Sequence, residues 1–143
     1  MSIPLLRLDP DLPVPRPARV GDAGLDLMAR EPHELAPKGG RAIVPTGFAV
    51  ALPPGTAGLI VPRSGLAVRH GVTVVNAPGL IDSGYRGELC VVLINTGAEP
   101  YSVSRGDRIA QLVIVEVPAV ELVEVETLDA TERGAGRFGH SGR

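Results

Sequence analysis

The stretch NAPGLIDSGYRGEL, residues 76–89, gathers five side chains able to do chemistry within thirteen residues: Asn76, Asp82, Tyr85, Arg86 and Glu88. An Asn amide both donates and accepts hydrogen bonds, so it suits the edge of a nucleic-acid base. A Tyr ring close by suits stacking on a sugar. An ordinary hairpin loop also has this composition, so the stretch alone leaves both interpretations open.

Polar residues also interrupt apolar segments elsewhere. Asp26 lies in AGLDLMA, and Gln111 lies in the middle of RIAQLVIV, where an unpaired buried amide would be costly. Arg63-Ser64-Gly65 follows the apolar segment GLIVP. A guanidinium, a hydroxyl and free N–H groups at the start of a helical turn suit a phosphate. The simpler interpretations are a structural acid at a strand end and an ordinary Ser cap.

The chain changes character after Glu126. TLDATERGAGRFGHSGR is rich in glycine and has no valine, leucine or isoleucine after Leu128. Such a segment cannot form a core of its own, and a frayed terminus is its usual fate. The alternative is a flexible flap that closes over a ligand. We therefore divide the chain into a domain at 1–126 and a tail at 127–143.

Three other patterns carry little weight. The glycines of GAGRFG match G-x-G-x-x-G, but no helix can follow them so near the end of the chain. Arg105-Gly106-Asp107 fits a turn before a strand. The three histidines have no partner at the spacing of metal ligands, and no C-x-x-C occurs, so a zinc site held by the protein is not expected.

The elements that must position these residues are strands. Glycine and proline number 18 and 14, which excludes a helical bundle, and the apolar residues form short runs rich in valine, leucine and isoleucine. Two segments, LCVVLIN and IAQLVIVEV, are almost continuously apolar and predict central strands. At most one helical turn is expected, after Arg63. The predicted strands are Leu5–Leu8, Leu25–Ala29, Arg41–Ala51, Ala57–Val61, Val72–Val75, Glu88–Asn95, Tyr101–Val103, Arg108–Val117 and Val120–Glu126.

Composition narrows the class of protein. A chain of 143 residues with 44% hydrophobic residues and a net charge of -2 predicts one globular domain. The pattern of short strands without a helix of ordinary length favours an all-β barrel, jelly roll or sandwich. No block of lysine or arginine is available to grip nucleic acid. The longest uncharged run, Ala42–Pro62, contains four prolines, so no membrane segment is expected. A single cysteine, Cys90, and the absence of a signal peptide favour the cytoplasm.

In this order and spacing, five segments resemble the five motifs of the homotrimeric dUTPase family. They are AGLDL, PRSGLA, NAPGLIDSGYRGEL, RGDRIAQLVI and RGAGRFGHSG, and they span about Gly21 to Gly142. The resemblance implies a jelly-roll-like β-barrel that forms a homotrimer with shared active sites and a flexible C-terminal tail. It also implies hydrolysis of dUTP to dUMP and pyrophosphate with Mg²⁺.

The resemblance further implies a role for each matching residue. Asp82 would activate the attacking water, and Asp26 would act on the metal through water, with Mg²⁺ held by the substrate phosphates. A carboxylate is suited to the first role, since it can take a proton from a bound water. Phe138 would cover the uracil and Tyr85 would exclude a 2′-hydroxyl. The implied substrate-binding residues are Arg63, Ser64, Gly65, Asn76, Gly79, Ile81, Tyr85, Gln111, Arg133, Phe138, Gly139 and Ser141.

The tail departs from the family pattern at Arg137, where glycine is common, and at His140, where serine is common.

Two alternatives to dUTP hydrolysis stay open. One is a dCTP deaminase-like or bifunctional enzyme of the same fold, which would need a general acid/base at the cytosine amine. The other is a non-catalytic nucleotide-binding trimer, for which Asp82 would be dispensable.

Overall fold

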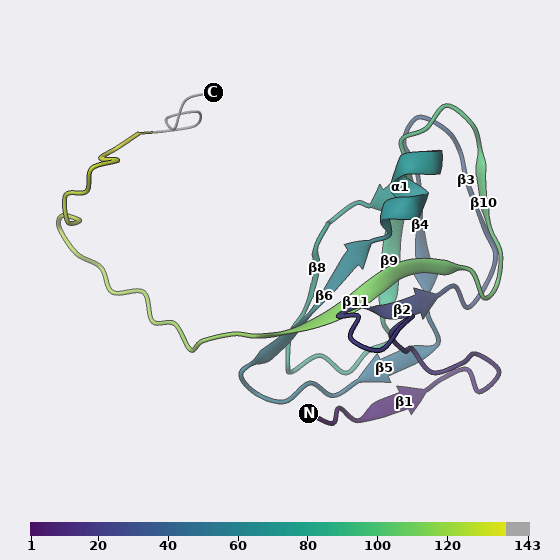
Figure 1. The fold of residues 1–143 in the computed structure, drawn as a ribbon, viewed down its shortest axis with the longest axis horizontal. Helices are drawn as coiled ribbons and strands as arrows, with labels where there is room; N and C mark the ends of the chain where they lie inside the picture. The colour runs from purple at the N-terminus through teal and green to yellow at the C-terminus, as the bar shows by residue number, and fades with distance from the viewer. Residues whose placement is uncertain (137–143) are drawn as a thin grey trace.

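The computed structural model describes residues 1–136 and is built almost wholly from β-strands (Figure 1). The predicted all-β class is confirmed. Within residues 1–136 no helix has the length and apolar character needed to cross a membrane. The elements in chain order are β1 Leu5–Arg7, β2 Leu25–Met28, β3 His33–Leu35, β4 Gly40–Pro45, β5 Phe48–Val50, β6 Thr56–Pro62, α1 Ser64–His70, β7 Val72–Val74, β8 Gly79–Ile81, β9 Cys90–Asn95, β10 Tyr101–Val103 and β11 Arg108–Glu116.

The strands pair antiparallel in four small sheets. The largest has the order β2-β11-β6-β8, and a three-stranded sheet has the order β4-β9-β7. β1 pairs with β5, and β10 pairs with β3. The two segments predicted to be central, within β9 and β11, each have a strand on both sides. The prediction that they are central is confirmed, although their two faces are not equally covered: along β9, buried residues alternate with partly buried ones.

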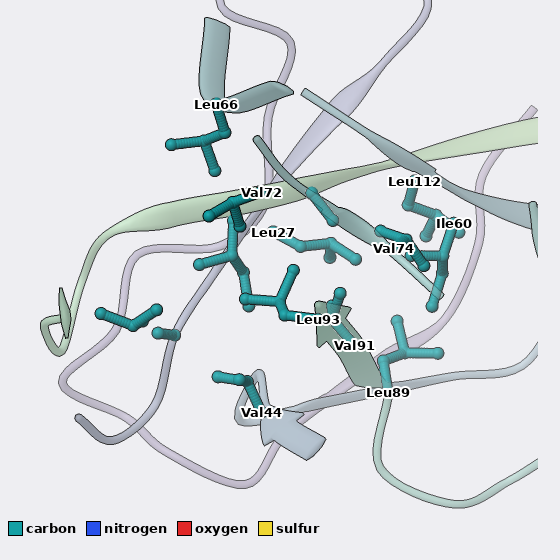
Figure 2. Close-up of a cluster of buried hydrophobic side chains, with 14 of the residues drawn as sticks. Leu27, Val44, Ile60, Leu66, Val72, Val74, Leu89, Val91, Leu93 and Leu112 are labelled. Carbon is teal, nitrogen blue, oxygen red and sulfur yellow. The ribbon is translucent and has the colours of Figure 1, made fainter. Parts of the chain in front are cut away.

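The core lies between these sheets, where aliphatic side chains from most strands meet (Figure 2). Leu27 of β2, Val44 of β4 and Leu93 of β9 have no exposed surface. Leu66 anchors α1 to the same cluster. Aliphatic packing thus fixes the sheets that position the polar residues, and within residues 1–136 Phe48 is the only fully buried aromatic side chain.

Three sequence predictions need correction. The predicted strand Arg41–Ala51 is divided into β4 and β5, because Gly47 takes a φ of +78° between them. β3 and β8 were not predicted, and each is only three residues long. Val120–Glu126 is not a strand, because these residues find no pairing partner within the described part of the chain.

The helix α1 is longer than the single turn predicted, with seven residues. It ends at Gly71, whose φ of +66° closes the helix in the left-handed conformation and allows its N–H to donate to the carbonyls of Leu66 and Ala67. The sequence places glycine where that conformation costs least.

A polar cluster ties the N-terminal segment to the turn before β11. The guanidinium of Arg105 donates to both carboxylate oxygens of Asp9, over 2.6 and 3.0 Å. Nε of Arg30 lies 3.5 Å from Oδ2 of Asp9. The hydrogen bonds from Arg105, together with the N–H of Asp11 and the charges of both arginines, lower the pKa of Asp9 to about 2, although its partial burial opposes the shift.

This pKa predicts a loss of stability in acid. A carboxylate with a lowered pKa in the folded state contributes fully above its ordinary pKa of 3.8, and its contribution disappears as the pH falls towards 2. Asp9→Asn should therefore lower the free energy of unfolding at pH 7 and flatten its pH dependence between about pH 4 and 2. Chemical denaturation across that range is the measurement. Asp11→Asn, which removes an exposed neighbouring acid, is the control, and identical pH profiles for Asp9→Asn and wild type would contradict the prediction.

Candidate active site

Asp26 lies at the centre of a cluster of basic and amide groups on the largest sheet. Its side chain is 6% exposed, and Nε of Arg63 lies 3.4 Å from Oδ1. Nη1 of Arg108 donates to Oδ2 over 3.2 Å, and Nε2 of Gln111 donates to Oδ1 over 3.3 Å. The negative charge of Asp26 is thus balanced by two guanidinium groups. The predicted residues Asp26, Arg63 and Gln111 are brought together.

Strand register builds this cluster. Gln111 of β11 pairs with Asp26 of β2 on one side and with Val61 of β6 on the other. Arg63 follows two residues after Val61, so the end of β6 brings it beside the same carboxylate. Gly24 leaves room for the amide, because a Cβ atom there would lie 2.9 Å from Cδ of Gln111.

Arg63 and Ser64 mark the change from strand to helix. Arg63 is extended, with φ −93° and ψ 123°, and caps α1 without a side-chain hydrogen bond. Ser64 is therefore the first residue of the helix, and the interpretation of it as an ordinary Ser cap is wrong. Nη1 of Arg63 donates to the carbonyl of Arg108 over 3.2 Å. The guanidinium of Arg63 is held from two sides as a result.

Arg108 belongs to the cluster but was not predicted. Its side chain contacts Asp26, and its carbonyl contacts Arg63. The available signal was its position in RGDRIAQL, three residues before Gln111. A charged residue at the junction of a turn and a strand is normally solvent-exposed, so residue type gave no reason to select it.

The second group of predicted residues lies on β8 and the loop that follows it. Gly79 and Ile81 form the ends of β8, and a Cβ atom at Gly79 would lie 3.3 Å from Nδ2 of Asn76. The loop begins with a turn in which the N–H of Tyr85 donates to the carbonyl of Asp82 over 3.0 Å. Asp82 is exposed, and Tyr85 has 42% of its surface exposed.

One chain does not bring Asp82 to the Asp26 cluster. β8 runs antiparallel to β6, and Ile81 pairs with Gly58. Arg63 comes five residues after Gly58, which at about 3.3 Å per residue places it roughly 16 Å further along β6. Asp82 follows Ile81 in the direction away from Arg63. Within one chain Asp82 is therefore separated from the Asp26 cluster, whereas Gly79, which pairs with Ile60 of β6, lies nearer to it.

The tail supplies the remaining predicted residues. Arg133 is exposed in a turn in which the N–H of Gly134 donates to the carbonyl of Thr131 over 2.9 Å. This turn belongs to a long extended segment that leaves the sheets after β11 (Figure 1). Phe138, Gly139 and Ser141 lie outside the described residues, as do Arg137 and His140.

The residues present limit how a metal ion is held. Within residues 1–136 no group of three or more His, Cys, Asp or Glu side chains is arranged to hold one. Mg²⁺ commonly keeps several waters and binds phosphate oxygens with only one or two carboxylates. Asp26 therefore fits an ion that is held mainly by a phosphate ligand.

The fold is that of solved dUTPases. Over 99% of both chains, a mutant dUTPase of Staphylococcus bacteriophage 80alpha bound to dUpNHpp matches with a TM-score of 0.90 and 29% identity. A mutant dUTPase from phage phi11 of S. aureus matches with a TM-score of 0.81 and 26% identity, over 91% of this chain and 100% of that one. The phi11 structure is described as revealing the coordination of a structural Mg(II) ion.

Sequence similarity gives the family. The dUTPase family model matches residues 11–142. A deoxyuridine 5'-triphosphate nucleotidohydrolase of Thermobifida fusca is 59% identical, over 99% of this chain and 79% of its own length. The protein of the same name from Caulobacter vibrioides is 58% identical, over 92% of this chain and 87% of its own length. The chain belongs to the dUTPase family.

Proposed function

We propose that this chain hydrolyses dUTP to dUMP and pyrophosphate at active sites that are shared between the copies of a homotrimer. It is a dUTP diphosphatase by its family. The observation that supports shared sites is the separation of Asp82 from the Asp26 cluster within one chain. A second copy, placed with its Asp82 loop against this cluster, would complete the site. The deaminase-like alternative has no support from the family match.

Asp82 is the proposed base. Its exposed position lets it receive a water molecule, and the turn to Tyr85 holds its backbone. An ionised carboxylate hydrogen-bonded to that water accepts a proton as the oxygen attacks phosphorus. Placing the acid on a turn fixed by backbone hydrogen bonds also reduces the entropy lost in aligning the water.

The proposed nucleoside site follows along β8. The amide of Asn76 and the backbone groups of Gly79 and Ile81 supply donors and acceptors for the uracil edge. Backbone groups in a strand are held firmly, so a base with a different pattern would leave them unpaired. Tyr85 would stack on the deoxyribose and leave no space for a 2′-hydroxyl.

Arg63, Ser64, Gly65 and Gln111 are the proposed phosphate ligands. In the structure Arg63 and Gln111 both contact Asp26. A triphosphate brings a larger negative charge than one carboxylate, so it would draw these donors away from Asp26. Once Arg63 and Gln111 bind phosphate in place of Asp26, the carboxylate oxygens of Asp26 would be free to accept hydrogen bonds from the waters bound to the metal. Arg108 would remain as the partner of Asp26.

Mg²⁺ is the proposed cofactor, held by the substrate phosphates, with Asp26 acting on it through water. When bound, the ion neutralises phosphate charge and stabilises the charge that develops on the leaving group. The residues of this chain orient its water shell and supply the remaining cationic donors.

The tail, proposed as residues 127–143, would close over a site of the trimer. Arg133 and Ser141 would hold the γ-phosphate, Phe138 would cover the uracil, and Gly139 would approach the substrate closely. The preceding segment supports this proposal, because Val120, Leu122 and Val123 are 72%, 93% and 72% exposed in the single chain. Covering such a run of exposed apolar side chains with a second copy would stabilise the assembly.

The cytoplasm is the proposed location, in keeping with the single thiol of Cys90.

Asp82→Asn should remove turnover while leaving dUTP binding intact. The amide keeps the shape of the side chain but cannot accept the proton, so kcat should fall by about 10²- to 10⁴-fold. Pyrophosphate release and the Kd of dUpNHpp are the two measurements. Asp11→Asn controls for the loss of one exposed acid. A kcat near that of wild type would remove Asp82 from the role of base.

Shared sites predict complementation between two inactive variants. Asp82→Asn and Arg63→Ala each damage one half of every site. If they are unfolded and refolded together in equal amounts, about a quarter of the sites should combine an intact Asp82 with an intact Arg63. Pyrophosphate release should return to about that fraction of the wild-type rate. Activity that stays at the level of the separate variants would show that each site is built from one chain.

Truncation tests the tail. A chain that ends at Thr131 should form the same trimer, since the described core contains no residue beyond β11. Its dUTP turnover should fall by at least about tenfold, because closure excludes water and completes the phosphate contacts. Light scattering reports assembly, and pyrophosphate release reports turnover. Full turnover by the truncated trimer would make the tail dispensable.

A further inference from the structure

The loop that carries Asp82 and Tyr85 has a second fixed point at Glu88. Oη of Tyr85 donates a hydrogen bond to the carbonyl of Glu88 over 2.9 Å. The phenol crosses directly over Gly87, where an added Cβ atom would lie 2.8 Å from Cζ of Tyr85. The orientation of the tyrosine ring therefore depends on where the backbone of Glu88 lies.

The side chain of Glu88 is itself anchored on the turn between β4 and β5. Oε1 accepts a hydrogen bond from the N–H of Gly47 over 2.7 Å, and Nη1 of Arg30 lies 3.4 Å from the same oxygen. The side chain of Glu88 is 23% exposed. Loss of this acceptor would leave the N–H of Gly47 without its side-chain partner in a partly buried position.

The backbone beside Glu88 is held on the same turn. The N–H of Leu89 donates to the carbonyl of Phe48 over 2.7 Å, and Oγ1 of Thr46 donates to the carbonyl of Leu89 over 2.7 Å. These bonds keep the end of the loop in place without Glu88. The carbonyl of Glu88 and the N–H of Leu89 belong to one planar peptide group, so the bond to Phe48 holds one side of this carbonyl. The side chain of Glu88, anchored on Gly47, holds the Cα atom on its other side and so contributes to the position of the carbonyl on which Tyr85 rests.

We propose that Glu88 is a positioning residue that sets the selectivity of this enzyme for deoxyribose over ribose. It holds the carbonyl that receives the Tyr85 hydroxyl, and so fixes the distance between the tyrosine ring and the sugar. This inference rests on the proposed function, in which Tyr85 lies against the deoxyribose. It adds a link from the β4–β5 turn to sugar selection.

Two substitutions separate the acceptor of Glu88 from its charge. Glu88→Gln retains an oxygen that can accept from Gly47 N–H, whereas Glu88→Ala retains none. Glu88→Ala should therefore let the loop relax, and Glu88→Gln should largely preserve it. Glu34→Ala is the matched control, because the Glu34 carboxylate also accepts one short hydrogen bond, 2.8 Å from Oγ of Ser102, but lies on β3 in another sheet.

The measurement is the ratio of kcat/KM for dUTP to that for UTP, with the Ki of UTP replacing its kcat/KM if UTP turnover is too slow to follow. Glu88→Ala should lower this selectivity by about five- to tenfold, the effect expected for one lost hydrogen bond between protein groups. Glu88→Gln should stay within about twofold of wild type, as should Glu34→Ala. A merely structural role would lower the melting temperature and leave the selectivity unchanged, and that result would overturn the proposal.

A double-mutant cycle with Tyr85→Phe tests whether Glu88 acts through the tyrosine. Tyr85→Phe removes the same hydrogen bond from its donor side, so it should lower selectivity alone, and adding Glu88→Ala should have little further effect. If Glu88→Ala fails to fold, unchanged selectivity in Tyr85→Phe still refutes the proposal. Additive losses in the double variant would also refute it. Failure of wild type to hydrolyse dUTP would instead contradict the proposed function.

Discussion

Strand β11 is the element on which the rest of the molecule depends. It pairs with β2 along one edge and with β6 along the other, and its register decides which side chains of the three strands meet. Because side chains alternate between the two faces of a strand, a shift of one residue would turn Gln111 away from Asp26. The same shift would remove Ile109 and Leu112 from their buried positions. The core and the polar cluster are therefore fixed by one set of backbone hydrogen bonds.

The second constraint is electrostatic. Asp26 is almost completely buried and is neutralised by the arginines on either side of it. A buried carboxylate without such partners would be costly, so the donors proposed for phosphate also stabilise the folded chain. Arg63 and Gln111 are already held near the proposed phosphate position before they exchange Asp26 for substrate, which lowers the entropy that binding must overcome. Preorganisation and stability are served by the same contacts here.

Much of the fold could be predicted from sequence, for identifiable reasons. β9 and β11 were evident because each is a run of six or nine mostly apolar residues, whereas three-residue strands such as β3 and β8 have too few residues to show a period. Val120–Glu126 was predicted as a strand because apolar and polar residues alternate along it. Such alternation indicates a segment with one apolar face, but it does not say whether that face is covered by the same chain.

The candidate site, like the fold, could be predicted from the sequence only in part. Residue types and the family resemblance identified Asp26, Arg63 and Gln111, and the structure places these three together. The distance of Asp82 from them was not evident, because it depends on the antiparallel register between β6 and β8. Glu88 was noted by residue type without a role, and Arg108 was not predicted, for a related reason. Their partners, Gly47 and Asp26, are remote in sequence, and a charged surface residue gives no local signal of such a contact.

The projecting segment after β11 has a consequence for how the protein behaves in the cell. A newly made chain exposes valine and leucine side chains to solvent, and under the proposed assembly it also lacks a complete site. Catalytic competence would then appear only when chains meet, so specific activity would rise with protein concentration. The interval before that encounter is also when the exposed strand-like sequence is most prone to mispairing. Rapid assembly would thus protect the chain from aggregation in the same step that makes it an enzyme.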